Sequence, residues 1–507
     1  MRTFLFILSI LLLTGNLYSQ ITFSKLYKAG TSGLRIIDNG KANYSFYSTS
    51  KDPATGNYLN RKIFTTDLLG GAIDTSVLYI ANRNIYGANK VIRINNGFVF
   101  SGSVAYPNHS TAFIIFTDSS FNKTKQLIYG DTISNTYTFF ITNDACVLNS
   151  GDMMFCGQEN DTTKQPQDLD MLIIKTDSAG NKLWKKTYSY KMTDRAWFIE
   201  PTPDGGAIIG GNSFYGATLQ GQLRTYDAVV LKVDSAGNEQ WHKVWGNPSL
   251  NDFWAVVANT SDGNYLLGTC YATQDTIMNN YNEYTDKVIN IIKVDTSGNE
   301  IWNKYYDSPK KMREISRMIQ LSNGNIVATG RYWDWVNPQY FTSWILLLNN
   351  NGDSIWYHEY FYSMNKDAEN IINDIKPTPD GGYICCGEFS DGLNGIPQSL
   401  WVLKLDSSGW YYGMGIETLA SLSLRHKLKV FPNPVSTNVT IDLSDFVQQK
   451  NIRLYLTNSE LKELKVIVVP NGSKFIRMDL SSYAVGMYFI RLQSGREILG
   501  VEKLIKK

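Results

Sequence analysis

Residue types that commonly catalyse reactions or bind metals are scattered along this chain and form no known motif. The four histidines, His109, His242, His358 and His426, include no pair at metal-ligand spacing. Glu359 follows His358, but no second histidine stands four residues further on, so no zinc-protease helix is predicted. The nucleophile elbow, the P-loop and the dinucleotide-binding glycine motif are also missing. We predict no metal, no cofactor and no catalytic residue, while two carboxylates that meet only in the fold, as in glycosidases, remain an open alternative.

The densest group of aromatic residues lies in one polar segment, RYWDWVNPQYFTS, residues 331–343. Aromatic rings beside Asn, Gln and Asp suit stacking on, and hydrogen bonding to, a sugar or a protein surface. An equally favoured interpretation is that the rings pack this segment onto the strands beneath it. We predict that any ligand meets the five aromatic residues of the segment: Tyr332, Trp333, Trp335, Tyr340 and Phe341.

The segments that position these residues belong to an internal repeat. VDSAGNEQW (233–241), TDSAGNKLW (176–184) and VDTSGNEIW (294–302) are near copies of one another. The first turn residue recurs at intervals of 51 to 61 residues, at Asp67, Asp118, Asp177, Asp234, Asp295, Asn349 and Asp406. A period of this length indicates one supersecondary unit that is used repeatedly.

One period, residues 194–246, predicts four strands and no helix. The strands AIIGG and AVVLKV are apolar throughout, which suits sheets covered on both faces by neighbouring sheets. Four-stranded sheets packed around a ring form a β-propeller. Two kinds of turn each recur seven times, so we predict a seven-bladed β-propeller over residues 20–413, with residues 21–28 completing the last blade. Repeats of this type resemble a broad class of secreted bacterial propellers, a resemblance that implies fold alone.

The alternating strand direction within a blade separates two faces of the predicted disc. The short turns share one face, and the long, irregular connections share the other, which indicates a recognition surface there. These connections are residues 212–226, 269–287, 331–343 and 388–399. A tryptophan stands at the same place after the tight turn in four repeats, and we interpret it as packing of the outer strand on the next blade: Trp184, Trp241, Trp302 and Trp356.

Residues 1–19 have the pattern of a secretory signal peptide. Arg2 supplies the positive start, and the apolar run from Phe4 to Leu13 is too short to span a bilayer. Cleavage after Ser19 would leave Gln20 as the first residue of the mature chain. No later segment is apolar enough to be predicted as transmembrane.

Five cysteines in a secreted chain leave at least one thiol unpaired. Cys146 and Cys156 lie on one predicted hairpin, so a disulfide between them stays open. Cys156 and Cys386 hold equivalent places in repeats that are not neighbours, and they cannot pair. We interpret the cysteines as small buried apolar residues.

The C-terminal part of the chain differs in charge from the rest. Residues 425–507 carry 14 Lys and Arg against 7 Asp and Glu, a balance of +7, whereas residues 20–424 carry 33 against 39, a balance of −6. Strand-like runs between turn residues predict a second, small β-sandwich after a linker, residues 414–428.

The motifs of this tail, residues 429–507, resemble the type A sorting domain of the type IX secretion system of Bacteroidetes-type bacteria. KVFPNPVSTNVTIDL opens the domain, AVGMYFIRL follows, and EKLIKK ends it. The resemblance implies an immunoglobulin-like sandwich that interacts with the secretion and sorting machinery. The residues that match its motifs are Pro432, Asn433, Pro434, Gly486, Tyr488, Phe489, Lys506 and Lys507.

These patterns favour a secreted or surface-attached propeller that binds a glycan or a protein. A propeller-type enzyme acting on glycans, a lyase or a hydrolase, and a structural surface component are the alternatives. A net charge of +2 gives no support for a nucleic-acid partner. A central cluster of carboxylates, arginine and tyrosine on the long-loop face would favour the enzyme.

Overall fold

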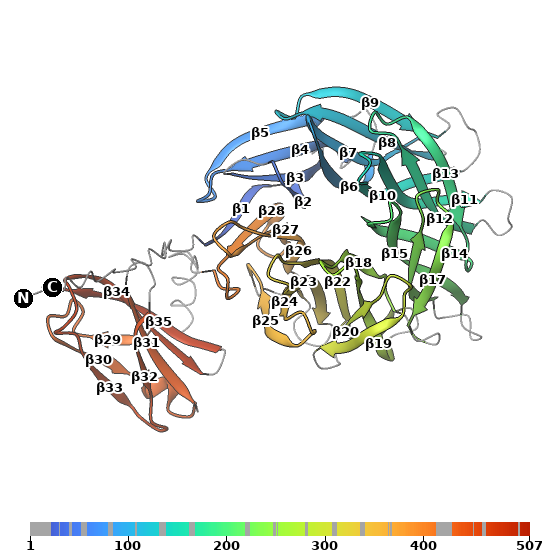
Figure 1. Ribbon diagram of the computed structural model, residues 1–507. Helices are drawn as coiled ribbons and strands as arrows, with labels where there is room; N and C mark the ends of the chain where they lie inside the picture. The colour runs from blue at the N-terminus through green and yellow to red at the C-terminus, as the bar shows by residue number, and fades with distance from the viewer. Residues whose placement is uncertain are drawn as a thin grey trace, which may run out of the picture. The chain divides into compact units, whose positions relative to one another are not determined.

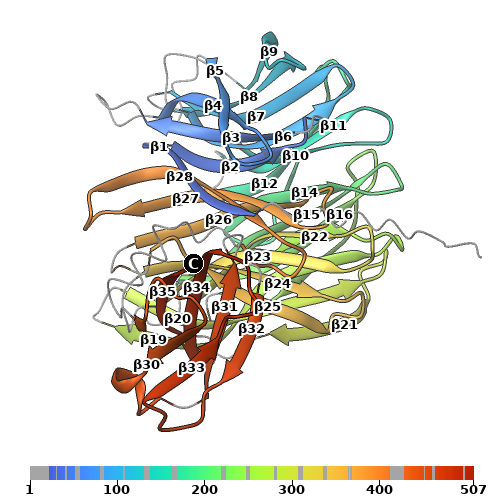
Figure 2. The same cartoon turned by 90° about the vertical axis from the view of Figure 1, so that its left-hand side faces the viewer.

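The computed structural model of the chain is all-β. It describes residues 22–29, 31–39, 43–51, 58–79, 85–106, 109–130, 138–161, 168–217, 224–246, 250, 252–278, 282–306, 312–334, 340–363, 365, 368–411, 428–449, 451–458, 463–494 and 497–507. Within these ranges the only helical element is a short 3-10 helix, η1 (Ser444–Phe446). One compact unit includes residues 25–410 and a second includes residues 411–507 (Figures 1 and 2). The predicted signal peptide lies outside the described residues.

Groups of four consecutive antiparallel strands build the first unit. The first groups are β2 (Thr31–Ile37), β3 (Tyr44–Lys51), β4 (Tyr58–Thr66) and β5 (Ala72–Tyr79); β6 (Ile85–Ile94), β7 (Gly97–Ala105), β8 (His109–Asp118) and β9 (Lys123–Tyr129); and β10 (Thr138–Val147), β11 (Met153–Asp161), β12 (Asp168–Thr176) and β13 (Lys182–Tyr188). The next are β14 (Thr193–Pro201), β15 (Ala207–Ala217), β16 (Arg224–Val233) and β17 (Glu239–Trp245); β18 (Val256–Asn259), β19 (Tyr265–Met278), β20 (Asn282–Val294) and β21 (Glu300–Tyr306); and β22 (Met312–Gln320), β23 (Ile326–Asp334), β24 (Tyr340–Leu348) and β25 (Ser354–Tyr360). The last group holds β26 (Ala368–Pro377), β27 (Tyr383–Asp391) and β28 (Ile396–Leu405), and β1 (Phe23–Ala29) pairs with β28.

The groups follow one another around a ring (Figure 1). The first strand of each group lies innermost, and these inner strands contact each other in the order β2, β6, β10, β14, β18, β22 and β26. The series closes because β26 contacts β2. Four-stranded sheets packed around an axis in this way define a β-propeller, so the predicted all-β propeller is confirmed.

The third strands of the groups are mostly buried on both faces, as their apolar sequences predict, whereas the outer strands are partly exposed. Strand β8 has nine buried residues followed by one half-buried residue, without the alternation of a sheet that has one wet face. All five cysteines are buried and none forms a disulfide. Cys146 lies opposite Met154 and Cys156 opposite Asp144 in the β10–β11 hairpin, so the register itself keeps the two thiols apart.

The tight turn between the third and fourth strands is an Asx-type turn. In the turn at Asp177, one carboxylate oxygen accepts the N–H groups of Ala179 at 2.9 Å and Asn181 at 2.8 Å. The other oxygen accepts the Asn181 side-chain amide at 2.8 Å. The carboxylate therefore satisfies the turn's own donors, which is why the DSAGN sequence recurs.

Each tight turn also receives the outer strand of the preceding group. Gly237 has φ +75°, and a Cβ built there would lie 2.8 Å from the ring of Trp184. The Tyr188 hydroxyl donates to the Gly237 carbonyl at 2.6 Å. The ring of Trp302 lies against Gly352 in the same way. These contacts agree with the prediction that the tryptophans pack the outer strand on the next blade.

A lysine on the third strand reaches the first turn of its own group. Its stem is buried while its ammonium neutralises the turn aspartate. The pairs are Lys175–Asp152 at 3.4 Å, Lys232–Asp204 at 2.7 Å, Lys293–Asp262 at 2.6 Å and Lys404–Asp380 at 2.9 Å.

The Asp262 pair predicts an acid-sensitive contribution to stability. Burial opposes ionisation, but the hydrogen bonds from Lys293 and Thr260 outweigh it and lower the pKa of Asp262 from 3.8 to about 2. A lowered folded-state pKa contributes stability above the unfolded pKa and loses it as the pH falls toward the folded value. We expect Asp262→Asn to be less stable than the wild type at pH 7, with a difference that shrinks between about pH 4 and pH 2. Denaturant titrations across this range measure it, and a pH-independent difference would contradict the assignment.

The long connections differ from the predicted irregular loops. Much of residues 269–287 is a continuation of the β19–β20 hairpin, which stays paired to Met278 and Asn282. Strands β15 and β16 likewise pair as far as Ala217 and Arg224. These segments are extended hairpins, in which cross-strand pairing satisfies the backbone N–H and C=O groups.

Two sheets form the second unit. One contains β29 (Lys429–Phe431), β30 (Asn438–Asp442) and β33 (Phe475–Asp479); the other contains β32 (Glu463–Val468), β31 (Ile452–Asn458), β34 (Gly486–Ser494) and β35 (Glu497–Lys506). Buried residues of both sheets, such as Ile441 and Leu454, share one core. This core is separate from the clusters of the propeller and gives the tail its own hydrophobic stabilisation.

Candidate functional site

A cluster of charged residues lines the axis of the propeller. The inner strands carry a charged side chain seven residues before the turn glycine in four groups, at Lys90, Asp144, Arg317 and Asp374. In β10, β22 and β26 this residue directly follows a β-bulge, which redirects the chain locally. With Glu200 of β14, these residues are named here the axial ion cluster.

Arg317 of β22 contacts β14, which is not its neighbour in the ring, as well as its neighbour β26. Its guanidinium lies 3.3 Å from the Glu200 carboxylate and 3.7 Å from that of Asp374. The sheet that contains β18 separates β14 from β22, so the Glu200 contact spans the axis. Lys90 forms a further ion pair with Asp144 at 3.0 Å.

Both aspartates of the cluster also hold the next group's inner strand. Asp144 accepts the Ile199 N–H at 3.1 Å, and Asp374 accepts the Ile36 N–H at 2.9 Å. The bond from Asp374 links β26 to β2 in the same way as the bond from Asp144 links β10 to β14. The side chain of Asp374 is 3% exposed and that of Asp144 is 1% exposed, so these hydrogen bonds and ion pairs replace the hydration that burial removes.

The electrostatics of the axis fit paired rather than free charges. Burial alone would lower the pKa of Arg317, but Glu200 and Asp374 hold it above its ordinary value. Burial lowers the pKa of Lys376, and Asp374 opposes that shift. Each carboxylate of the axial ion cluster lies within 3.7 Å of a cation.

We expect Arg317→Met to destabilise the propeller by roughly 3 kcal/mol, because Glu200 and the buried Asp374 would lose their shared cation. Arg93→Met is the matched control, since Arg93 pairs with Asp38 at 3.6 Å with side chains 54% and 69% exposed. An exposed pair of that kind contributes about 0–1 kcal/mol. Thermal and denaturant unfolding measure both variants, and equal losses would remove the special role of Arg317.

The aromatic residues of the segment 331–343 differ in their environments. The ring of Tyr332 is buried, and its hydroxyl donates to Glu359 at 2.9 Å, so this residue belongs to the core and not to an exposed patch. Phe341 is half-buried, with the Arg331 guanidinium 5.8 Å from its ring. Trp335 lies outside the described residues, as do the side chains of Trp333 and Tyr340.

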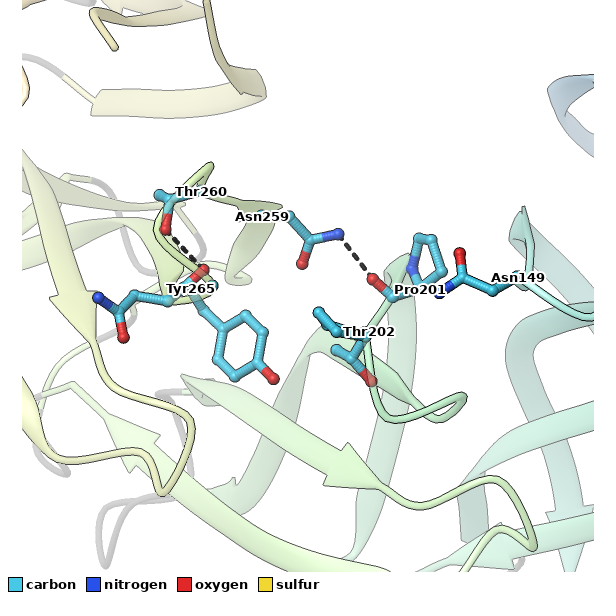
Figure 3. Close-up of a pocket in the computed structure, with 9 residues that line it drawn as sticks. Asn149, Pro201, Thr202, Asn259, Thr260 and Tyr265 are labelled. Atoms are coloured by element: carbon cyan, nitrogen blue, oxygen red, sulfur yellow. Dashed lines mark hydrogen bonds between the residues drawn. The ribbon is translucent and has the colours of Figure 1, made fainter.

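A shallow pocket of about 210 Å³ opens among the short turns, on the face of the propeller opposite the long connections. It is formed by the first turns of three successive groups (Figure 3). Asn149 comes from the β10–β11 turn, Pro201, Thr202 and Pro203 from the β14–β15 turn, and Asn259, Thr260, Gly263, Asn264 and Tyr265 from the β18–β19 hairpin. This turn pocket was not predicted from the sequence.

The sorting motifs, which are far apart in the sequence, meet in the second unit. The Asn433 amide donates to the Lys503 carbonyl at 2.6 Å, and its oxygen accepts the Ile505 N–H at 3.0 Å. Val435 and Lys507 are joined by a 2.8 Å backbone bond. The opening motif is therefore tied to the C-terminal strand by side-chain and backbone bonds.

The second motif lies on the same sheet. Gly486 pairs with Lys506 across β34 and β35, and the Tyr488 hydroxyl donates to the Ala484 carbonyl at 2.7 Å. Tyr488 and Phe489 are buried, whereas Pro432 and Pro434 are exposed beside Asn433.

In the described part of the chain, no three His, Cys, Asp or Glu residues are grouped so as to hold a metal ion. The same part contains no helix with the length and apolarity needed to cross a membrane.

The comparisons with known proteins concern the two units separately. Residues 429–507 match the family of secretion system C-terminal sorting domains. The chain is a β-propeller protein that carries this sorting domain, and the match indicates export by type IX secretion, to the cell surface or beyond it. No curated protein matches the chain.

Solved structures with a similar strand arrangement include polysaccharide lyase Uly1, with a TM-score of 0.42 and coverage of 78% of this chain and 94% of that one. A PL25 ulvan lyase reaches 0.41 over 76% and 96%. The β-propeller domain of the trilobed protease from Pyrococcus furiosus reaches 0.36 over 75% and 93%. Each is 10% identical in sequence, which carries no argument about activity.

Proposed function

We propose that this protein is a secreted or cell-surface binding propeller, exported by the type IX system, whose ligand is a glycan or a protein. Carboxylates and an arginine do meet at the axis, but each carboxylate is paired with a cation, and this pairing supports binding over catalysis. Asp144, Glu200 and Asp374 each lie within 3.7 Å of a cation, and the two aspartates also accept a backbone N–H. A hydrolase or a lyase needs side chains that are free to exchange a proton with the substrate.

The proposed domain plan is a signal peptide over residues 1–19, a seven-bladed propeller over 20–413, a linker over 414–428 and an immunoglobulin-like sorting domain over 429–507. The order of inner-strand contacts, which returns from β26 to β2, supports seven blades. The pairing of β1 with β28 supports closure by residues 21–28. A shared core between two sheets supports the sandwich.

The long-loop face remains a proposed binding surface, through Trp333, Trp335, Tyr340 and Phe341. We expect Trp333→Ala and Trp335→Ala to weaken binding of a ligand at that face by roughly 2 kcal/mol each while the fold survives. Glycan arrays and surface pulldowns with the mature chain supply the ligand, and unfolding curves check the fold. Loss of folding without a specific loss of binding would place these rings in the core.

The enzyme alternative has its own measurement. Incubation of the mature chain with polysaccharides, followed by assays for new reducing ends and for unsaturated sugar products, detects a hydrolase or a lyase. Turnover that is abolished by Glu200→Gln or Asp374→Asn in a folded variant would overturn the binding proposal.

A further inference from the structure

We propose that the turn pocket binds one neutral sugar unit, such as the end of a glycan chain. The inference rests on the proposed binding function and assigns it a site on the short-turn face, opposite the aromatic segment. It is carried by the uncharged lining of the pocket, its size, and an amide oxygen in its wall that lacks a hydrogen-bond donor among the described residues.

The lining of the turn pocket contains no charged side chain. Pro201 and Pro203 offer apolar ring faces, and Asn149, Asn259 and Asn264 offer amides. An ion or a phosphate would meet no compensating charge at such a surface, whereas a neutral polyhydroxylated ring needs this mixture of apolar faces and paired donors and acceptors.

Asn259 is the best-placed of these groups. Its side-chain nitrogen donates to the Pro201 carbonyl at 2.6 Å, which fixes the orientation of the amide between the two turns (Figure 3). The oxygen of the same amide is buried and receives no hydrogen bond from the described residues. A buried acceptor without a donor is costly, and a ligand hydroxyl would satisfy it once a small shift of the turns uncovers the oxygen.

Tyr265 supplies a complementary donor. Tyr265 is 2% exposed, and it lines the turn pocket. Burial, together with the nearby Asp204, raises the pKa of Tyr265 to about 12, so the phenol stays protonated at neutral pH. The threonine hydroxyls are already used, since Thr202 donates to Asp204 at 2.5 Å and Thr260 donates to Asp262.

The size of the turn pocket limits what it can admit. A volume of about 210 Å³ is smaller than the roughly 300–1,000 Å³ of sites that enclose drug-sized ligands. It therefore suits one sugar ring at the end of a chain, with the remainder of the glycan in solvent.

The test uses the mature full-length chain and a set of simple probes. Methyl glycosides of glucose, galactose and mannose, together with N-acetylglucosamine, are titrated by saturation-transfer NMR and calorimetry, with glucuronic acid as the charged comparison. We expect at least one neutral probe to bind and the charged one to bind more weakly. Absence of binding by every neutral probe would overturn the proposal.

Two variants then locate the site. Tyr265→Phe removes one hydroxyl and Asn259→Ala removes the orphan acceptor, and each should weaken binding about fivefold or more. Tyr383→Phe is the matched control, because Tyr383 is a buried tyrosine that begins β27 as Tyr265 begins β19. It should leave binding unchanged. If Asn259→Ala fails to fold, Tyr265→Phe still decides, since it keeps the ring.

The same titration separates this site from the long-loop face. Sugar binding that survives Tyr265→Phe but is lost in a folded Trp333→Ala variant would refute the turn pocket and leave the proposed binding function standing. Sugar binding that is lost only in the Tyr265 and Asn259 variants supports the turn pocket.

Discussion

Deletion of residues 429–507 is expected to abolish export and to leave the propeller in the periplasm. The deleted residues match the secretion system C-terminal sorting domain over their whole length, and they form a compact unit with its own core. The propeller should keep its fold, because its core clusters, as far as the structure describes the chain, are built from its own residues. Fractionation with immunoblotting of cell surface, medium and periplasm measures the effect. Surface display or release of the truncated chain at the wild-type level would contradict the assignment.

A point variant tests whether the contact between the sorting motifs matters for export. Asn433→Ala removes the 2.6 Å and 3.0 Å bonds that tie the opening motif to β35, so the sorting domain should lose roughly 1–2 kcal/mol and export should fall. Asn438→Ala is the control, because the Asn438 side chain makes a single 3.4 Å contact with Thr437. Equal export by both variants would show that this tie is not needed.

The repeated parts of the propeller could be predicted because they depend on local chemistry. Asp177 and Asn181 make the tight turn from within five residues, and Trp184 follows at a fixed offset. A turn of this kind is specified by its own sequence, and its recurrence then specifies the ring. The tail could be predicted for a related reason, since its motifs occur in order.

The axial ion cluster could not be assembled from the sequence, although a signal for it was present. Asp144, Arg317 and Asp374 each stand seven residues before the turn glycine of their repeat. The repeat shows where each charged residue stands in its strand, but it does not show which residue it pairs with. Arg317 pairs with Glu200, which lies across the ring. The turn pocket was missed because its groups are ordinary amides, and only the fold shows that the Asn259 oxygen has no donor.

Removal of residues 20–30 is expected to destabilise the propeller by several kcal/mol. Strand β1 pairs with β28, and the Tyr27 hydroxyl donates to the Gly70 carbonyl at 2.6 Å. Tyr129 makes the same 2.6 Å bond to Gly180 between groups that are consecutive in the chain, so Tyr27 does at the closure what its equivalent does elsewhere in the ring.

The deletion would expose the edge of β28 and remove the buried ring of Tyr27 from its contact with Phe64, at a centroid distance of 4.6 Å. Two single variants show how much of the loss in stability comes from the tyrosine hydrogen bond and how much from opening the ring. Tyr27→Phe and Tyr129→Phe should each cost about 1 kcal/mol, because each loses one hydroxyl bond. The deletion should cost several times more, since it opens the ring as well as removing core contacts. A chain that starts at Thr31 and unfolds at the wild-type temperature would show that the ring does not depend on β1 for its closure.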